Sequence, residues 1–367
     1  MNLLARQAEA LFWLGRYIER TAGLARILLV QTAFDRGRAE GTNWDWLLAL
    51  YDESQDFHER YAEADSNSVI HYFVNDAEHP GSILRCLAAA RLNVRSLRAM
   101  ISTDFWMQTN RAYRRVKELP ESALRESRLA STCEAIQIDC YALYGISTST
   151  LYRDAGWRFF TLGKQLERAD QMSRLLDVRF AQLQTGTAEG GAALGDFTHW
   201  SMLLRACGGH HAYRRLVSGP LQPENVARFL IFEQCFARSI SHCLNATEQS
   251  VLVLRKVCDV PTPTRLIKRL SSLRDMIHLA QGDPGLIPHL HTFNDAIQSH
   301  LIELTNDLGD CYFEIDLDPS VLAVDSSPDL EEPEWIEPHL NEDGSKDNDK
   351  PAQGSTSQTQ SQIQSTS

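Results

Sequence analysis

Apolar residues recur at spacings of three and four along most of this chain, and this pattern limits the fold more than any other feature of the sequence. In the first long segment, Leu11, Leu14, Ile18, Ala22 and Ala25 follow that spacing, which places them on one side of an α-helix with 3.6 residues per turn. No segment alternates convincingly between polar and apolar residues, as a half-buried strand would. The sequence therefore predicts an all-α helical bundle.

Proline and glycine separate the periodic segments from one another. Pro120-Glu121 and Pro223-Glu224 place proline and an acidic residue where the first turn of a helix favours them. The segments between such breaks predict about ten to twelve helices, with the folded core ending near Asp316.

Two blocks of sequence occur twice in the same order. Residues 12–28 match residues 160–176 at seven of seventeen positions, and residues 82–98 match residues 239–255 at eight of seventeen. Ordinary residue frequencies would give roughly one match in a block of this length. The repetition therefore predicts an internal duplication.

The period of this duplication sets the expected architecture. It is roughly 150 residues, longer than the 20–50 residues of a solenoid repeat. We expect one helical domain over residues 1–318, built from pseudo-symmetric halves of about 1–147 and 148–318 around a pseudo-twofold axis. Gly15 and Gly163, which match between the copies, should lie where two helices cross closely, because glycine leaves room for a neighbouring backbone.

Residues 319–367 lack this helical pattern. Their last part, residues 326–367, holds nine acidic residues against two lysines and ends in a polar run almost without apolar residues. Such a segment cannot bury enough surface to offset chain entropy, so the sequence predicts a disordered acidic and polar tail. Trp335 and Ile336 could instead dock on a partner.

Charge and composition exclude several classes of protein. The net charge of −12 argues against nucleic-acid binding, which needs a basic face. The eight cysteines include no CxxC pair, which is typical of a reducing compartment. The sequence has no apparent signal peptide, and no run approaches the roughly 18–20 apolar residues that span a bilayer. We therefore expect a soluble protein in the cytoplasm, without a membrane association.

The first helical segment carries an unusual charged stripe. Arg6, Glu9, Trp13, Arg16 and Arg20 lie within about 80° of one another on a helix that advances 100° per residue. One interpretation is structural: Glu9 pairs with Arg16 or Arg6, and Glu19 pairs with Arg26 or with the other half, as buried ion pairs that fix the packing register.

A second interpretation is a binding site. In this hypothesis the basic residues and a neighbouring aromatic line a cleft between the halves and hold a phosphate or carboxylate through bidentate contacts. The candidate ligand-binding residues are Trp13, Arg16, Arg20, Lys164 and Arg168.

The sequence carries no complete motif for a known chemistry. It has no Glu-x-x-His pair of a di-iron bundle, no HExxH, no phosphate-binding glycine loop and no nucleophile elbow. No metal and no cofactor are therefore expected. The candidate acids or bases are Glu9, Glu19 and Glu167, and the protein is more readily interpreted as a non-enzyme than as an enzyme.

Several motifs together resemble the alpha-E family of bacterial proteins. They are residues 8–20 (AEALFWLGRYIER), Pro80-Gly81-Ser82-Ile83, Gly156-Trp157-Arg158-Phe159, Leu162-Gly163 and Glu167-Arg168, and the resemblance covers roughly residues 1–315. Ala22 and Leu92 stand where the family pattern suggests glutamate, and these departures suit a scaffold or a divergent paralogue better than a catalyst.

The resemblance implies partners. Members of the alpha-E family are found beside, or fused to, circularly permuted ATP-grasp domains and transglutaminase-like proteins. It thus implies an accessory or scaffold role in ATP-grasp-linked peptide or amide-bond synthesis or modification. The alternative is an enzyme in its own right that uses Glu9, Glu19 or Glu167 on an anionic, peptide-like substrate. An open pocket around Glu19 and Glu167 would favour the enzyme, and a saturated ion-pair network would favour the scaffold.

Overall fold

The computed structural model describes residues 3–35, 44–184, 192–256, 258, 260–283, 285–286 and 288–313. Within these ranges the chain forms fifteen α-helices and no strand, which confirms the all-α prediction. The tail expected over residues 319–367 lies outside the described residues, as do Trp335, Ile336 and the expected core end near Asp316.

The described helices outnumber the ten to twelve expected because some are very short. Four of them have seven residues or fewer: α2 (Asp45–Tyr51), α3 (Ser54–His58), α7 (Glu121–Leu124) and α11 (His210–Leu216). One or two turns are too few to show an apolar period in the sequence. Pro120 precedes α7, and Pro223 begins α12 (Pro223–Phe232), as their sequence signals predicted.

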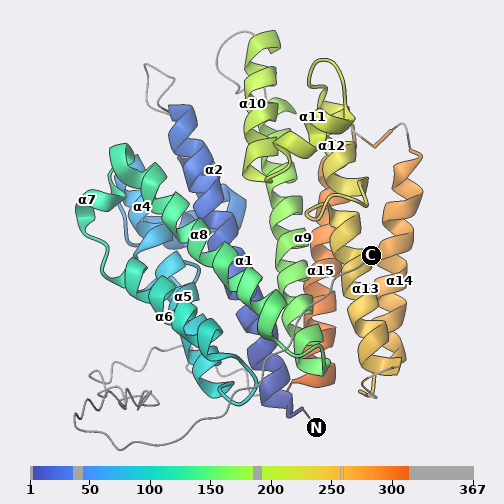
Figure 1. The fold of residues 1–367 in the computed structure, drawn as a ribbon. Helices are drawn as coiled ribbons and strands as arrows, with labels where there is room; N and C mark the ends of the chain where they lie inside the picture. Colours follow the sequence, from blue (N-terminus) through green and yellow to red (C-terminus); the bar gives the residue numbers. More distant parts are fainter. Residues whose placement is uncertain are drawn as a thin grey trace, which may run out of the picture. The chain divides into compact units, whose positions relative to one another are not determined.

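Two long helices form the centre of the bundle. They are α1 (Ala5–Asp35) and α9 (Ala155–Gln184), which pack side by side (Figure 1). Each is covered by further helices, so apolar side chains are buried around much of its circumference, including Phe12, Ile18 and Leu162.

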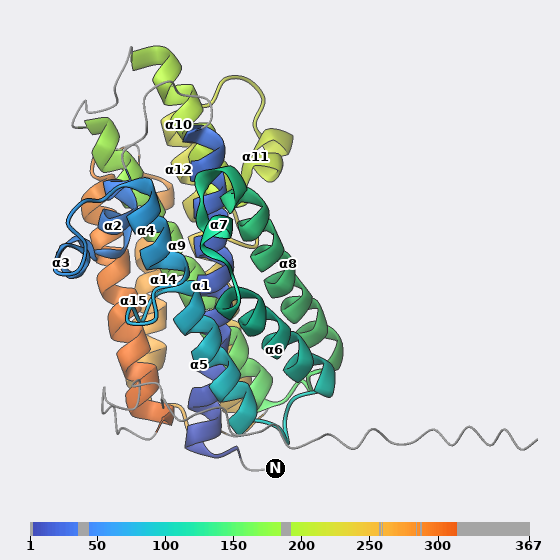
Figure 2. The same cartoon turned by 90° about the vertical axis from the view of Figure 1, so that its left-hand side faces the viewer.

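The remaining long helices pack around these two in the same chain order. The helices α5 (Ile83–Ser96) and α8 (Glu126–Thr150) lie on α1 and are joined by α6 (Thr103–Lys117) (Figure 2). The helices α13 (Ile240–Lys256) and α15 (Leu290–Tyr312) lie on α9 and are joined by α14 (Thr264–Gln281). The internal duplication itself stays a prediction, which superposition of the two halves would test.

Matched serines begin matched helices. The Ser82 hydroxyl accepts a hydrogen bond from the Arg85 amide and donates one to the Asp76 carbonyl. The Ser239 hydroxyl accepts from the His242 amide and donates to the Glu233 carbonyl. In each case the serine satisfies an amide in the first turn and fixes the chain that enters the helix.

The crossing of α1 and α9 is too close for side chains. A Cβ added at Gly15 would lie 2.3 Å from the Phe160 carbonyl oxygen, and one added at Gly163 would lie 1.8 Å from the Phe12 carbonyl oxygen. Both glycines therefore lie where the sequence predicted a close crossing, and each faces the backbone of the other helix.

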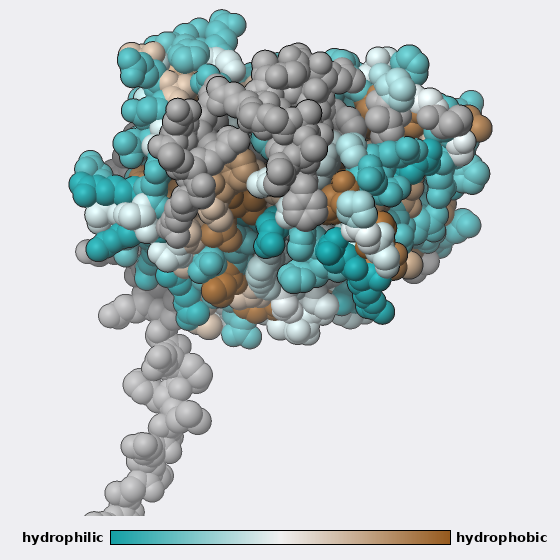
Figure 3. All heavy atoms as spheres, turned by 90° about the horizontal axis from the view of Figure 1, so that it is seen from above, coloured by the Kyte–Doolittle hydropathy of each residue, from teal (hydrophilic) through white to brown (hydrophobic). Residues whose placement is uncertain are grey.

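Two further helices pack against this arrangement. They are α4 (Ser66–Val74), which contacts α5 and α7, and α10 (Ala192–Ala206), which contacts α1, α11 and α12. The face seen in Figure 3 is mostly hydrophilic, with smaller hydrophobic patches between the hydrophilic residues. No described helix is long and apolar enough to cross a membrane.

Candidate functional site

Glu19 is fully buried and lies at the centre of a network of partly buried side chains. Its carboxylate is 2.7 Å from Arg168 Nη2 and 2.7 Å from Arg238 Nη1, and it accepts a 2.6 Å hydrogen bond from the Tyr144 hydroxyl. Burial alone would raise the pKa of the Glu19 carboxyl, but Arg238 and Arg168 outweigh it and hold that pKa well below its ordinary value. We call these four residues the Glu19 network.

Glu167 lies at the centre of a second network on the same helix pair. Arg16 Nε is 2.8 Å from Glu167 Oε2, and Arg20 binds both carboxylate oxygens, with Nε 2.6 Å from Oε1 and Nη2 3.2 Å from Oε2. Although burial opposes ionisation, Arg20 and Arg16 lower the pKa of Glu167 to about 2. We call these three residues the Glu167 network.

The two networks exchange partners between helices. Arg20 of α1 binds Glu167 of α9, and Arg168 of α9 binds Glu19 of α1. Each Glu-Arg dipeptide thus supplies the glutamate of one network and an arginine of the other. This pairing corrects one expectation from sequence: Arg16 pairs with Glu167 of the opposite helix rather than with Glu9. Glu19 does pair with the other half, as one interpretation held.

The remaining predicted residues lie around these networks. Trp13 stacks its ring 5.4 Å from the Arg16 guanidinium carbon, and Lys164 Nζ lies 5.6 Å from the Tyr144 ring. Burial and the nearby Arg168 lower the pKa of Lys164 to about 8. Glu9 is half-buried and ten residues before Glu19, which is about 15 Å along the helix, so these two carboxylates cannot act on one reacting atom.

A small cavity adjoins the Glu167 network. It has a volume of about 120 Å³, and its walls come from α1, α9, the end of α2, α4 and the segment before α5. The lining residues are Arg20, Leu24, Tyr51, Glu53, Phe73, Gly81, Glu167, Asp170 and Arg174. Of the predicted site residues only Arg20 and Glu167 line this cavity.

Glu53 and His79 form a close pair at the cavity wall. Glu53 Oε2 lies 3.1 Å from His79 Nε2, and their side chains are only 21% and 4% exposed. Burial raises the pKa of Glu53 to about 7 and lowers the pKa of His79 to about 4. At neutral pH the histidine is therefore uncharged, and Glu53 exchanges its proton within the physiological range.

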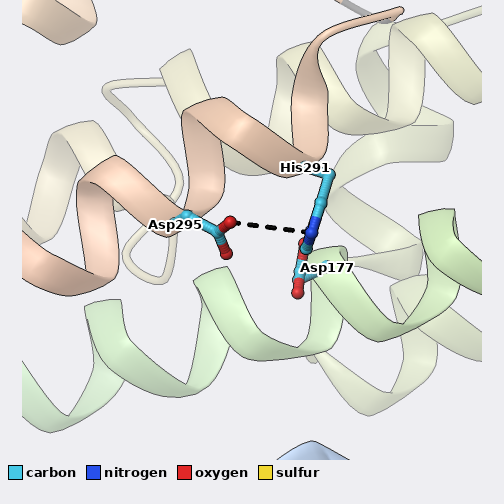
Figure 4. Close-up of side chains that lie close together, drawn as sticks. All are labelled: Asp177, His291 and Asp295. Carbon is cyan, nitrogen blue, oxygen red and sulfur yellow. Dashed lines mark hydrogen bonds and ion pairs between the residues drawn. The ribbon is translucent and has the colours of Figure 1, made fainter.

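A separate triad lies on the surface between α9 and α15. His291 Nδ1 is 2.6 Å from Asp177 Oδ1, and His291 Nε2 is 3.6 Å from Asp295 Oδ2 (Figure 4). These donor atoms are of types that bind divalent cations. However, the side chains of His291 and Asp295 are 58% and 56% exposed, and the hydrogen bond that His291 donates to Asp177 raises the pKa of His291. We interpret the triad as an ion-pair group that joins the two helices.

Comparison with known proteins identifies the family. A family model described as a predicted alpha-helical domain with a conserved ER motif matches residues 3–313. The chain belongs to the Alpha-E family. The chain has Glu-Arg dipeptides on α1 and α9, Glu19-Arg20 and Glu167-Arg168, and these are the residues that exchange partners between the two networks. A further dipeptide, Glu59-Arg60, follows the short helix α3.

Curated relatives of this Alpha-E chain are uncharacterised. An uncharacterised protein of Mycobacterium bovis is 25% identical over 319 residues, covering 82% of this chain and 34% of its own length. An uncharacterised protein of Mycobacterium tuberculosis strain H37Rv is 24% identical over the same span and with the same coverage. The chain thus spans about a third of the length of these relatives. No solved structure matches it.

The sequence analysis did not include several residues that line the cavity beside the Glu167 network. Asp170 and Arg174 follow Glu167 at three and seven residues, which places them on the same helix face, so this signal was present. Tyr51 lies at the end of α2 and Glu53 lies just before α3. The apolar spacing of the sequence does not predict that these two residues lie near α1 and α9.

Proposed function

We propose that this chain is an accessory helical domain, without a catalytic group of its own, that serves an ATP-grasp peptide ligase in making or modifying amide bonds. The observation that carries the non-catalytic part is the state of Glu19 and Glu167. Both are almost completely buried and bound by two arginines each.

A general acid or base must exchange a proton near the working pH. The pKa of Glu167 is about 2 and that of Glu19 is lower than its ordinary value, so both carboxylates stay ionised at neutral pH and are poor bases. Their lone pairs already accept from guanidinium groups and from Tyr144. This arrangement supports a structural role for the Glu-Arg dipeptides rather than acid–base catalysis by them.

The partner in this proposal comes from family resemblance. Alpha-E proteins resemble this chain and occur beside or fused to circularly permuted ATP-grasp domains and transglutaminase-like proteins. The curated relatives are about three times as long as the region they share with this chain, which supports a domain that works together with other domains. A helical domain of this size offers broad surfaces for such an association.

The proposal is tested by reconstitution with a circularly permuted ATP-grasp ligase from the same genome. ATP-dependent amide formation should be measured, as ADP release and as product mass, for the chain alone, the ligase alone and the two together. We expect no turnover by the chain alone, and a higher rate or a different product when both are present.

Two variants distinguish this role from an enzyme. Glu167→Gln removes a candidate base, and Glu248→Gln, at an exposed pair with Arg274, is the matched control. If the isolated chain turned over an anionic peptide-like substrate, and Glu167→Gln abolished that turnover without unfolding the protein, the chain would be an enzyme and the accessory role would be wrong.

A further inference from the structure

The cavity beside the Glu167 network is the right size for a very small molecule. Its volume is about 120 Å³, while a cavity of roughly 150 Å³ holds benzene. An occupant of about five or six non-hydrogen atoms therefore fits. That range includes the smallest α-amino acids and excludes nucleotides and peptides of several residues.

Two guanidinium groups line the cavity from the long helices. Arg174 of α9 uses Nε to bind Asp170, at 3.1 Å and 3.2 Å from its two carboxylate oxygens. Arg20 of α1 uses Nε and Nη2 to bind Glu167. Each guanidinium group carries five N–H donors, and such groups bind carboxylates through two hydrogen bonds.

An acceptor lines the cavity from a different part of the chain. Glu53, just before α3, contributes a carboxyl group that is not bound to any arginine in the ion pairs of the described residues. Tyr51, at the end of α2, lines the same cavity, and its buried hydroxyl has no hydrogen-bond partner among the residues that the structure describes. Because a buried hydroxyl without a partner is costly, this group favours a polar occupant.

The balance of charge selects the kind of occupant. A phosphate or dicarboxylate would bring negative charge against Glu53, Glu167 and Asp170, and a metal cation would lie against Arg20 and Arg174. A molecule with one positive and one negative charge can place its positive group near the carboxylates and its negative group near the arginines. Leu24 and Phe73 add an apolar wall, against which a methyl group can pack.

We propose that this cavity binds a small zwitterion of the α-amino-acid class, with its carboxylate on Arg20 and Arg174 and its ammonium group on Glu53 and the Tyr51 hydroxyl. This site does not depend on the ligase partnership proposed above. It is formed by described residues of this chain alone, so the isolated protein should bind the ligand whether or not a partner is present.

The proton on Glu53 makes the site sensitive to pH. The ammonium group binds the ionised carboxylate of Glu53. Burial and the nearby Asp56 hold the pKa of Glu53 at about 7 against the Tyr72 hydroxyl, Arg20 and Arg174, which lower it, and His79, 3.1 Å away, is uncharged at this pH because its pKa is about 4. Binding should therefore strengthen as pH rises through 7, and the bound ammonium group should lower the pKa of Glu53. A site that recognised only an anion through its arginines would bind more weakly as Glu53 ionised.

Calorimetric titration of the full chain tests the proposal. The probes are glycine and L-alanine, with acetate and methylamine as ligands that carry one charge each, and L-phenylalanine as a zwitterion too large for the cavity. We expect saturable binding of glycine and L-alanine. Acetate and methylamine should bind at least about tenfold more weakly because each loses one set of charge-assisted hydrogen bonds, and L-phenylalanine should do so because its side chain does not fit.

Variants assign the binding to this cavity. Glu53→Gln should weaken L-alanine binding about tenfold or more and remove its rise with pH, while Tyr51→Phe should weaken it less. Arg174→Met should weaken it comparably to Glu53→Gln, and Arg274→Met, at the exposed pair with Glu248, should leave it unchanged.

Two results would contradict the proposal. If the folded protein, confirmed by circular dichroism, does not bind glycine or L-alanine at pH 8, the cavity is not a zwitterion site. If acetate binds as tightly as L-alanine, and Glu53→Gln strengthens both, the site recognises a simple anion. Reconstitution with the ligase is a separate measurement, so failure here leaves the accessory role standing, and failure there leaves this site standing.

Discussion

Adding one methyl group at the α1–α9 crossing should destabilise the protein strongly. A Cβ at Gly163 would lie 1.8 Å from the Phe12 carbonyl oxygen, against a minimum of about 3.0 Å for real Cβ contacts. The two backbones would therefore have to separate by about 1.2 Å. Because the obstacle is backbone, no rotamer change can relieve it.

The expected magnitude combines two opposing effects. Overpacking a core costs about 1–3 kcal/mol, and sometimes more, and an obstacle made of backbone favours the upper end. Replacing glycine by alanine within a helix gains about 1 kcal/mol. Gly163→Ala should thus lower the free energy of unfolding by about 2 kcal/mol or more. Gly15→Ala, whose Cβ would lie 2.3 Å from the Phe160 carbonyl oxygen, should behave similarly.

Gly145 provides a matched control on another long helix. It lies within α8, and a Cβ added there would meet no atom within 4 Å. Gly145→Ala should therefore stabilise the protein by about 0.5–1 kcal/mol. Urea unfolding followed by far-UV circular dichroism measures all three variants. A Gly163→Ala protein as stable as Gly145→Ala would show that α1 and α9 do not cross at this distance, and would refute the reasoning.

Three further predictions concern the charged groups. Glu167→Leu leaves two arginines without their buried partner and should lower the free energy of unfolding by about 3–5 kcal/mol. The triple variant Arg16→Met, Arg20→Met and Glu167→Leu should unfold near the wild-type urea midpoint, because all three charges are removed together. Equal losses of stability in both variants would exclude a buried ion triad. The pKa values of Glu19 and Glu167 are lowered, and that of Glu167 is about 2 against an unperturbed 4.5. The two ionised carboxylates should therefore stabilise the fold fully above pH 4.5, and this stabilisation should be lost as pH falls toward 2. Acid titration followed by circular dichroism measures the loss. The pKa of Glu53 is raised to about 7, so the contribution of its protonated carboxyl to the free energy of unfolding is complete below pH 4.5 and is lost as pH rises through 7. The stability of the wild type relative to Glu53→Gln should therefore be greater at pH 5 than at pH 8. The opposite order would contradict the burial of this carboxyl.

The sequence predicts the helices and the crossing glycines because both depend on local pattern. The three- and four-residue spacing of apolar side chains determines which face of each long helix is buried. The shared positions of Gly15 and Gly163 indicated a close contact, and both lie at the crossing. These features need no knowledge of which residues meet across the core.

Partner choice within the networks was harder to predict. Glu9 and Arg16 are seven residues apart on α1, so a pair between them can be inferred from helix geometry alone. Arg16 instead binds Glu167, 151 residues away, because the close crossing brings α9 within reach of its guanidinium group. Tyr51 and Glu53 line the cavity because of the way in which the short helices α2 and α3 pack. Helices this short do not show a clear apolar period in the sequence, so their packing could not be predicted from it.

The crossing glycines and the Glu-Arg dipeptides form one structural unit. Glu19 and Arg20 follow Gly15 by four and five residues, and Glu167 and Arg168 follow Gly163 by the same intervals, which is about 6–8 Å along each helix. The glycines set the distance between α1 and α9, and that distance lets each arginine reach the glutamate of the other helix without water between them. Separating the helices at Gly163 should therefore lengthen these ion pairs, admit water and raise the pKa of Glu167 toward its ordinary value. Since Arg20 and Glu167 also line the cavity, the same Gly163→Ala variant should weaken L-alanine binding there, although Gly163 does not line the cavity itself.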